Sequence, residues 1–153
     1  MNPAAVTVYC DLMLEIKNRT SVAVAFGRNE LNAKFEATTI EVIYLQFRKI
    51  LEMIALGSLV ANKEVYSQAR ADFAKDWNAE LIMKDMGRVN PNFYPVPIIQ
   101  QPSSTPGVKM DLINRTNDYL TKDDLVVLYK KCGAIMHSSK EPPLNYRMTS
   151  FEG

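Results

Sequence analysis

The stretch from Ile40 to Ala61 constrains the fold more than any other part of the sequence. On a helix it presents one broad apolar face, and further apolar side chains cover much of the remaining surface. The broad face is made of Ile40, Ile43, Tyr44, Phe47, Ile50, Leu51 and Ile54. At 1.5 Å per residue this helix is about 30 Å long and crosses a whole domain. It therefore predicts a central helix that other helices cover on several sides.

Helical spacing of apolar residues predicts three more helices. The first spans about residues 6–26 and ends at Gly27, because glycine commonly follows the last residue of a helix. The next begins after Asn62 and extends to about residue 89, and Asn78 is either a break in it or a surface turn. The last spans residues 121–137. Together with the central helix, these segments account for most of the chain.

Capping residues help to place two helix starts. Thr121 is a good N-cap for the last helix, and Asp123 and Asp124 follow where the helix dipole favours negative charge. For the central helix, Thr38 or Thr39 is the expected N-cap.

The segment from residue 90 to residue 107 has a different character, because five of the eight prolines lie in it. We expect an extended strip laid against the bundle by four apolar residues, Phe93, Tyr94, Ile98 and Ile99. Residues 108–113 then alternate weakly between apolar and polar, and the turn-rich residues 114–118 follow. This pattern allows a short β-hairpin at that point.

The predicted fold is therefore mainly α: a bundle of four to five helices with a proline-rich crossing segment and room for a short β-hairpin. Residues 1–137 form one helical domain, and residues 138–153 form a loose C-terminal tail without periodicity. A length of 153 residues, with 47% apolar and 23% charged side chains, suits a single globular domain with a real core.

Charge and motifs argue against several function classes. Eighteen Lys and Arg against seventeen Asp and Glu give a net charge of +1, which removes the simplest argument for a nucleic-acid or acidic-membrane partner. The glycine-rich dinucleotide fingerprint, the phosphate-binding P-loop and the nucleophile elbow of α/β-hydrolases are absent from the sequence. One histidine and two distant cysteines, Cys10 and Cys132, match no metal-ligand spacing. We expect neither a metal nor a cofactor.

The sequence also predicts a cytoplasmic location. Residues 1–5 carry no basic region typical of a signal peptide. The longest apolar run, residues 53–61, is too short to span a bilayer. Two cysteines are too few for a disulfide scaffold, so free thiols in a reducing compartment are expected. No membrane partner is expected.

Three ionisable residues of the central helix form a first candidate site. Glu41, Arg48 and Glu52 lie in one narrow stripe, because seven and eleven residues are close to whole helical turns. One interpretation is an internal network that fixes the register of the helices. The other is a polar cleft in which Arg48 binds an anion and the two carboxylates hold the Arg48 side chain in place. Lys130 of the last predicted helix is grouped with these candidates.

His137 is the second candidate site. It closes the last predicted helix, where a cation interacts favourably with the helix dipole. The alternative is a general base acting on a ribose hydroxyl, with a neighbouring cation that stabilises the developing negative charge. Lys130 and Lys131 precede it on the same helix.

The last helix also carries a resemblance to a known family. Residues 120–125 (LTKDDL), 128–133 (LYKKCG) and 136–137 (MH) resemble the closing helix of small HEPN-type helical bundles. Residues 45–52 (LQFRKILE) and 93–97 (FYPVP) are also similar to a group of bacterial proteins of uncharacterised function. The resemblance implies a small helical bundle, common pairing into homodimers, and a context in bacterial toxin–antitoxin or phage-conflict systems.

The resemblance assigns roles residue by residue. Ribonuclease members of the HEPN family have an arginine four to six residues before a histidine, usually followed by a polar residue. His137 takes the place of the histidine and Lys131 that of the arginine, while Cys132 stands at the polar position. Lysine lacks the planar fork that grips a phosphate at two points. Together these departures favour an inactive or binding-only member over an active nuclease.

Three functions follow as hypotheses. The first is a non-catalytic HEPN-like module that binds a nucleotide, a nucleic acid or a protein partner in a bacterial or phage conflict system. The second is a metal-independent endoribonuclease that uses His137 and Lys131. The third is a structural subunit that acts only through protein contacts. A homodimer is compatible with each of them, because a second copy can cover surplus apolar surface of the central helix.

Overall fold

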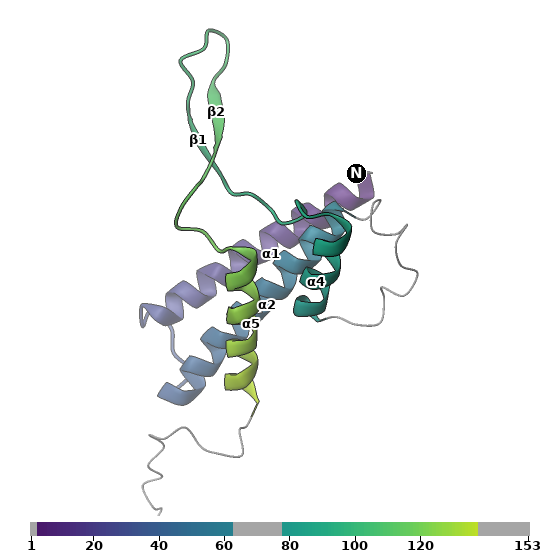
Figure 1. Ribbon diagram of the computed structural model, residues 1–153. Coiled ribbons are helices and arrows are strands. Elements are labelled where there is room, and N and C mark those ends of the chain that lie inside the picture. Colours follow the sequence, from purple (N-terminus) through teal and green to yellow (C-terminus); the bar gives the residue numbers. More distant parts are fainter. Residues whose placement is uncertain (1–2, 63–77, 138–153) are drawn as a thin grey trace, which may run out of the picture.

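The computed structural model describes residues 3–62 and 78–137, and over these residues the protein is mainly α (Figure 1). The elements follow in the order α1 (Pro3–Gly27), α2 (Glu36–Ala61), α4 (Ala79–Val89), β1 (Ile98–Pro102), β2 (Met110–Asn114) and α5 (Lys122–Met136). The described ranges thus contain four helices and one two-stranded antiparallel sheet. The predicted mainly α fold with a short hairpin is confirmed.

Helix α2 is central, as its apolar pattern predicts. It packs against α1 along one side and against α4 and α5 on others (Figure 1). Leu51 and Ala55 of α2 are buried, and most of the core lies where α2, α4 and α5 meet. The other buried members of this cluster are Ala79, Ile82, Met83, Met86, Phe93, Leu125, Tyr129 and Cys132. Helix α1 contributes less, because Ala23 is its one buried residue.

The start of α2 differs from the prediction. The helix begins at Glu36 after the N-cap residue Phe35, whose side chain makes no capping hydrogen bond. Thr38 donates its hydroxyl to the Phe35 carbonyl oxygen, and Thr39 accepts a hydrogen bond from the Ala33 N–H. The prediction of Thr38 or Thr39 as N-cap was wrong, because both hydroxyls bind backbone groups that precede or open the first turn.

The start of α5 agrees with the prediction. Thr121 is the N-cap, and its hydroxyl oxygen accepts a hydrogen bond from the Asp124 N–H. Asp124 in turn accepts hydrogen bonds from the Thr121 hydroxyl and backbone N–H, which completes a capping box. These hydrogen bonds to its charged form lower the pKa of the Asp124 carboxyl.

The predicted helix of residues 62–89 is described only in its second part. Helix α4 begins after the N-cap Asn78, whose side chain accepts a hydrogen bond from the Glu80 N–H at 2.9 Å. Residues 63–77 of that prediction, and the tail predicted over residues 138–153, lie outside the described residues.

The hairpin lies further upstream than the sequence indicates. Strand β2 pairs with β1 of the proline-rich segment, in a register that sets Ile98 opposite Asn114 and Pro102 opposite Met110. The turn is therefore residues 103–109, where Gly107 has φ +82°, and not residues 114–118. Ile98 and Ile99 belong to β1 and are exposed, so the expectation that they lie against the bundle was wrong.

Two aromatic residues fix the base of the hairpin. We call residues 95–119 the hairpin arm, which projects away from the helices (Figure 1). Just before the arm, Phe93 is buried in the core, and the Tyr94 hydroxyl donates to the Leu120 carbonyl oxygen at 2.9 Å. That hydrogen bond joins the two ends of the arm. Burial, followed by the charges of Asp124 and Tyr119, raises the pKa of Tyr94 to about 12.

None of the helices within residues 3–62 and 78–137 has the length and the apolar character needed to cross a membrane.

Tyr94→Phe should lower the free energy of unfolding by about 1 kcal/mol, because it removes one hydrogen bond and keeps the ring. The folded state favours the neutral hydroxyl, so its contribution is complete below pH 10, the ordinary pKa of tyrosine, and is lost as the pH rises from 10 through about 12. Urea unfolding of both proteins between pH 7 and 12 measures this. The stability difference between them should shrink over that range, and a difference independent of pH would contradict the assignment.

Candidate functional site

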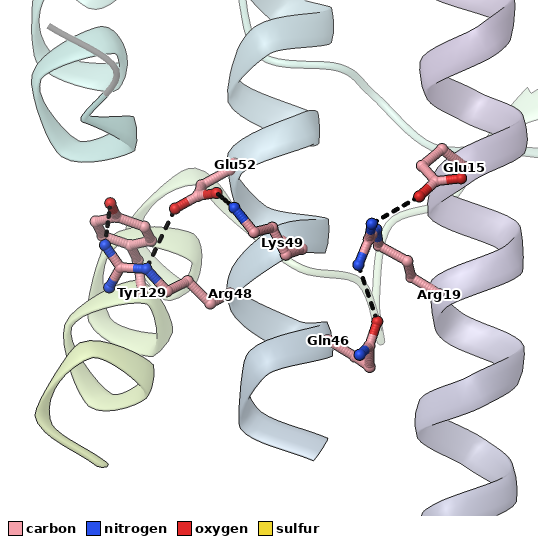
Figure 2. A network of polar contacts seen from close by, with 7 residues as sticks. All are labelled: Glu15, Arg19, Gln46, Arg48, Lys49, Glu52 and Tyr129. Carbon is pink, nitrogen blue, oxygen red and sulfur yellow. Dashed lines mark hydrogen bonds and ion pairs between the residues drawn. The ribbon is translucent and has the colours of Figure 1, made fainter. Parts of the chain in front are cut away.

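Arg48 bridges α2 and α5 through three kinds of contact (Figure 2). Its Nε lies 3.2 Å from Glu52 Oε1, one turn further along α2. Its Nη2 donates to the Tyr129 hydroxyl at 2.8 Å, and the guanidinium carbon lies 4.4 Å from the centroid of the same ring. The side chains of Arg48 and Glu52 are only 23% and 27% exposed. We call Arg48, Glu52 and Tyr129, with Lys49, the Arg48 cluster.

The surroundings of Arg48 explain why α5 can approach so closely. A Cβ atom at Gly133 would lie 2.9 Å from Arg48 Nη1, so the glycine leaves the space that the guanidinium needs. One residue earlier, burial raises the pKa of the Cys132 thiol, and the positive charge of Arg48 opposes that rise. Cys132 is fully buried and stays a thiol at neutral pH, which is unsuited to nucleophilic attack.

The Arg48 cluster has the contacts of an internal network. The Glu52 carboxylate is shared, because Lys49 Nζ lies 3.1 Å from its other oxygen. One carboxylate thus faces two cations, and the donors of Arg48 are directed at Glu52 and Tyr129 within the protein (Figure 2). These contacts favour the network interpretation of the sequence. Binding of an anion by Arg48 stays a prediction.

The other two members of that predicted site lie elsewhere. Glu41 is exposed, and within the described residues its carboxylate makes no hydrogen bond or ion pair. Lys130 is an exposed residue of α5 whose Nζ lies 2.8 Å from Glu80 Oε1 of α4. It thus links α5 to α4, whereas Arg48 links α5 to α2.

Lys131 and His137, the two residues of the nuclease hypothesis, are both exposed. Lys131 follows Tyr129 by two residues, or about 200° around the helix, and so lies on the opposite side of α5 from the contact with Arg48. His137 is the C-cap residue, and its backbone N–H bonds the Gly133 carbonyl oxygen at 3.1 Å. In the part of the chain that the structure describes, neither side chain forms a hydrogen bond or ion pair with Arg48.

A second polar contact joins α1 to α2. Arg19 lies 2.8 Å from Glu15 on α1 and donates to Gln46 Oε1 on α2 at 3.1 Å (Figure 2). Its Nε is buried and has no hydrogen-bond partner among the described residues. These contacts of Arg19 share no residue with those of the Arg48 cluster, so the hydrogen bonds and ion pairs form two separate groups.

Tyr129 could not be identified from the sequence as the partner of Arg48, because helical spacing places it with Leu125 and Cys132 on the apolar side of the last helix. The available signal was chemical: a tyrosine on a buried helix face needs a partner for its hydroxyl.

Sequence reasoning also did not identify the hairpin arm as an exposed apolar surface. Its apolar side chains are exposed on both faces of the ribbon, and no helix of the described ranges contacts either strand. These exposed residues are Val96, Ile98, Ile99, Val108, Met110, Leu112 and Ile113.

The described residues contain no group of three His, Cys, Asp or Glu side chains that could hold a metal ion.

Arg48→Met should lower the free energy of unfolding by about 2 kcal/mol, through loss of the charged hydrogen bond and the ring contact. The effect stays below that of a fully buried ion pair because Glu52 keeps Lys49. Lys49→Met is the matched control, an exposed partner of the same carboxylate, and should change stability by about 0.5 kcal/mol or less. Thermal and urea unfolding measure both. Equal effects would contradict a special role for Arg48.

Gly133→Ala tests the close approach at Arg48 independently. Alanine in a helix interior gains up to about 1 kcal/mol over glycine. In the wild type the new methyl group displaces the guanidinium, so most of this gain should be lost. In an Arg48→Met background the gain should reappear. A double-mutant cycle by urea unfolding gives the coupling, and additive effects would show that the two residues do not compete for space.

No family model, no curated protein sequence and no solved structure matches the chain. The resemblance of residues 120–137 to HEPN-type bundles therefore stays a prediction.

Proposed function

We propose that the protein is a non-catalytic binding module whose hairpin arm contacts a protein partner. The observation that carries the proposal is the exposure of apolar side chains along an arm that no described helix supports. Leu112 is 61% and Ile98 is 52% exposed, and both lie on the same face of the ribbon because β1 and β2 pair directly.

The contacts between two short strands are not enough to make a hairpin stable in water. An isolated hairpin is at best marginally stable in water, and stable sheets have a third strand or a packed face. Contiguous exposed apolar surface on a soluble protein commonly marks an interaction site. A protein that packs on the arm would supply the missing contacts. This is the protein-partner form of the HEPN-like hypothesis, and the bacterial or phage-conflict context and a cytoplasmic location are proposed with it.

The charges of the arm argue for protein over nucleic acid. Residues 95–119 contain Lys109 and Arg115 against Asp111 and Asp118, so the arm has no net charge. Proteins that bind nucleic acid depend on clustered Lys and Arg to contact phosphates. Lys131 and His137 are exposed on α5, away from both the arm and Arg48, which gives the endoribonuclease alternative little support.

An arm variant, Met110→Ser with Leu112→Ser, tests the proposal. Its matched control is Leu14→Ser on α1, because Leu14 is 59% exposed and Leu112 is 61% exposed. We expect the wild type and the control to form a complex with a protein partner. The arm variant should lose that complex and keep the circular dichroism signal of its helices. Native mass spectrometry gives the composition, and hydrogen exchange should show slower exchange of the amides of residues 98–114 in the complex.

Two results would overturn the proposal. One is unchanged association, with unchanged exchange in the arm, for the arm variant. The other is RNA cleavage in EDTA that is abolished in His137→Ala, or bound material absorbing at 260 nm that is lost in Arg48→Met, with no dependence on the arm.

A further inference from the structure

The free backbone groups of the hairpin lie along its two outer edges. Arg115 donates its N–H to the Pro97 carbonyl oxygen at 2.8 Å, and Ser103 donates to Lys109 at 3.3 Å. Hydrogen-bonded and non-hydrogen-bonded pairs alternate along an antiparallel ladder. The N–H and C=O groups of Met110, Leu112 and Asn114 therefore point away from β1, and no helix of the described ranges covers them.

The outer edge of β1 is less suitable for pairing. By the same alternation, its outward backbone groups belong to Ile98, Gln100 and Pro102. Proline has no N–H, so Pro102 interrupts the row of donors, which is a common way to protect a sheet edge. Strand β2 contains no proline. The open edge of the hairpin is thus β2.

We propose that this edge pairs with β2 of a second copy of the chain, about a two-fold axis at Ile113, to form a four-stranded antiparallel sheet. The inference rests on the proposed function, because it names the protein partner of the arm. A two-fold axis makes the two contact surfaces identical. The side chains and backbone groups of β2 must therefore be compatible with those of the same strand in the second copy.

Charge selects the register. Centred on Leu112, the pairing would set Lys109 opposite Arg115 of the second copy, and centred on Asp111 it would set two aspartates opposite each other. Centred on Ile113, it sets Asp111 opposite Arg115 of the second copy, twice, with the two Ile113 side chains between them. Opposite charges across adjacent strands stabilise a sheet, and like charges destabilise it.

The remaining alternatives use less of the strand. A register centred on Met110 would set Asp111 opposite Lys109 of the second copy, but it would place four of the five β2 residues beside the turn residues 106–109. One centred on Asn114 would set Asp111 opposite the uncharged Asn117. In the Ile113 register, one face of the sheet combines Ile98, Pro102, Met110 and Leu112 from both copies. These four residues of each arm then share one face of the four-stranded sheet.

Charge reversal tests the pairing with the full chain. Sedimentation equilibrium of the wild type should give a dimer, twice the chain mass of 17.3 kDa. Asp111→Arg alone and Arg115→Asp alone each set like charges opposite each other in a homodimer, and each should weaken dimerisation by about tenfold or more. An equimolar mixture of the two variants restores both opposite-charge pairs and should form a heterodimer. Met110→Ser keeps the backbone edge and both charges, and should weaken dimerisation less than either reversal.

A cross-link tests the register itself. In a Cys10→Ser background, which removes the exposed native thiol, Ile113→Cys should oxidise to a disulfide-linked dimer. Side chains directly opposite each other on adjacent strands have Cβ atoms about 4.5–5.5 Å apart, near the range of a disulfide. Leu112→Cys is the control, because residue 112 faces Asn114 of the second copy and should stay uncrosslinked.

The outcomes separate this inference from the proposed function. A wild type that stays monomeric, a mixture that fails to restore dimers, or cross-linking through residue 112 in place of 113 would overturn the second-copy pairing. If the wild type instead binds a different protein and the arm variant does not, the proposed function stands without the second-copy pairing. If the arm variant loses no association of any kind, both proposals fail.

Discussion

The burial of α2 by three other helices is the contact on which the rest of the structure depends. Leu51 and Ala55 are almost completely excluded from water, and the buried residues of α4 and α5 pack against the same part of α2. Burial of apolar surface is the main favourable term in folding, so this region contributes most to holding the described helices together. The N-terminal part of α2 is less covered, since Ile40, Leu45 and Phe47 remain partly exposed.

Polar residues give that apolar contact its specificity. Leucine and alanine pack equally well over a range of helix positions, whereas Arg48 must meet both Glu52 and the Tyr129 hydroxyl. The space at Gly133 adds a steric condition to the same position. The register of α5 on α2 is therefore set by a small number of directional contacts. The separate contact from Arg19 to Gln46 does the same for α1 on α2.

Much of this fold could be predicted from the sequence, because helix periodicity and the Thr121 cap depend on local spacing. The Arg48–Glu52 pair was accessible for the same reason, as both residues lie on one helix. Tyr129 could not be identified as their partner, since the contact joins residues 81 positions apart. The hairpin was misplaced because its strands are short, β1 lies inside the proline-rich segment, and period-two alternation cannot indicate which strand pairs with which. The prediction of Glu41 as a network member used angular position alone, which does not show what lies opposite.

The hydrogen bond from Tyr94 to Leu120 has a consequence for how this protein could change over time. Because this hydrogen bond joins the two ends of the hairpin arm, the arm is a long loop whose ends are held together at the helices. Closing a longer loop costs little more than closing a shorter one, so insertions between these two residues would hardly strain the helices. The arm and the bundle can therefore vary separately. Descendants of one ancestral chain could keep the same core and acquire different binding preferences by altering this single loop.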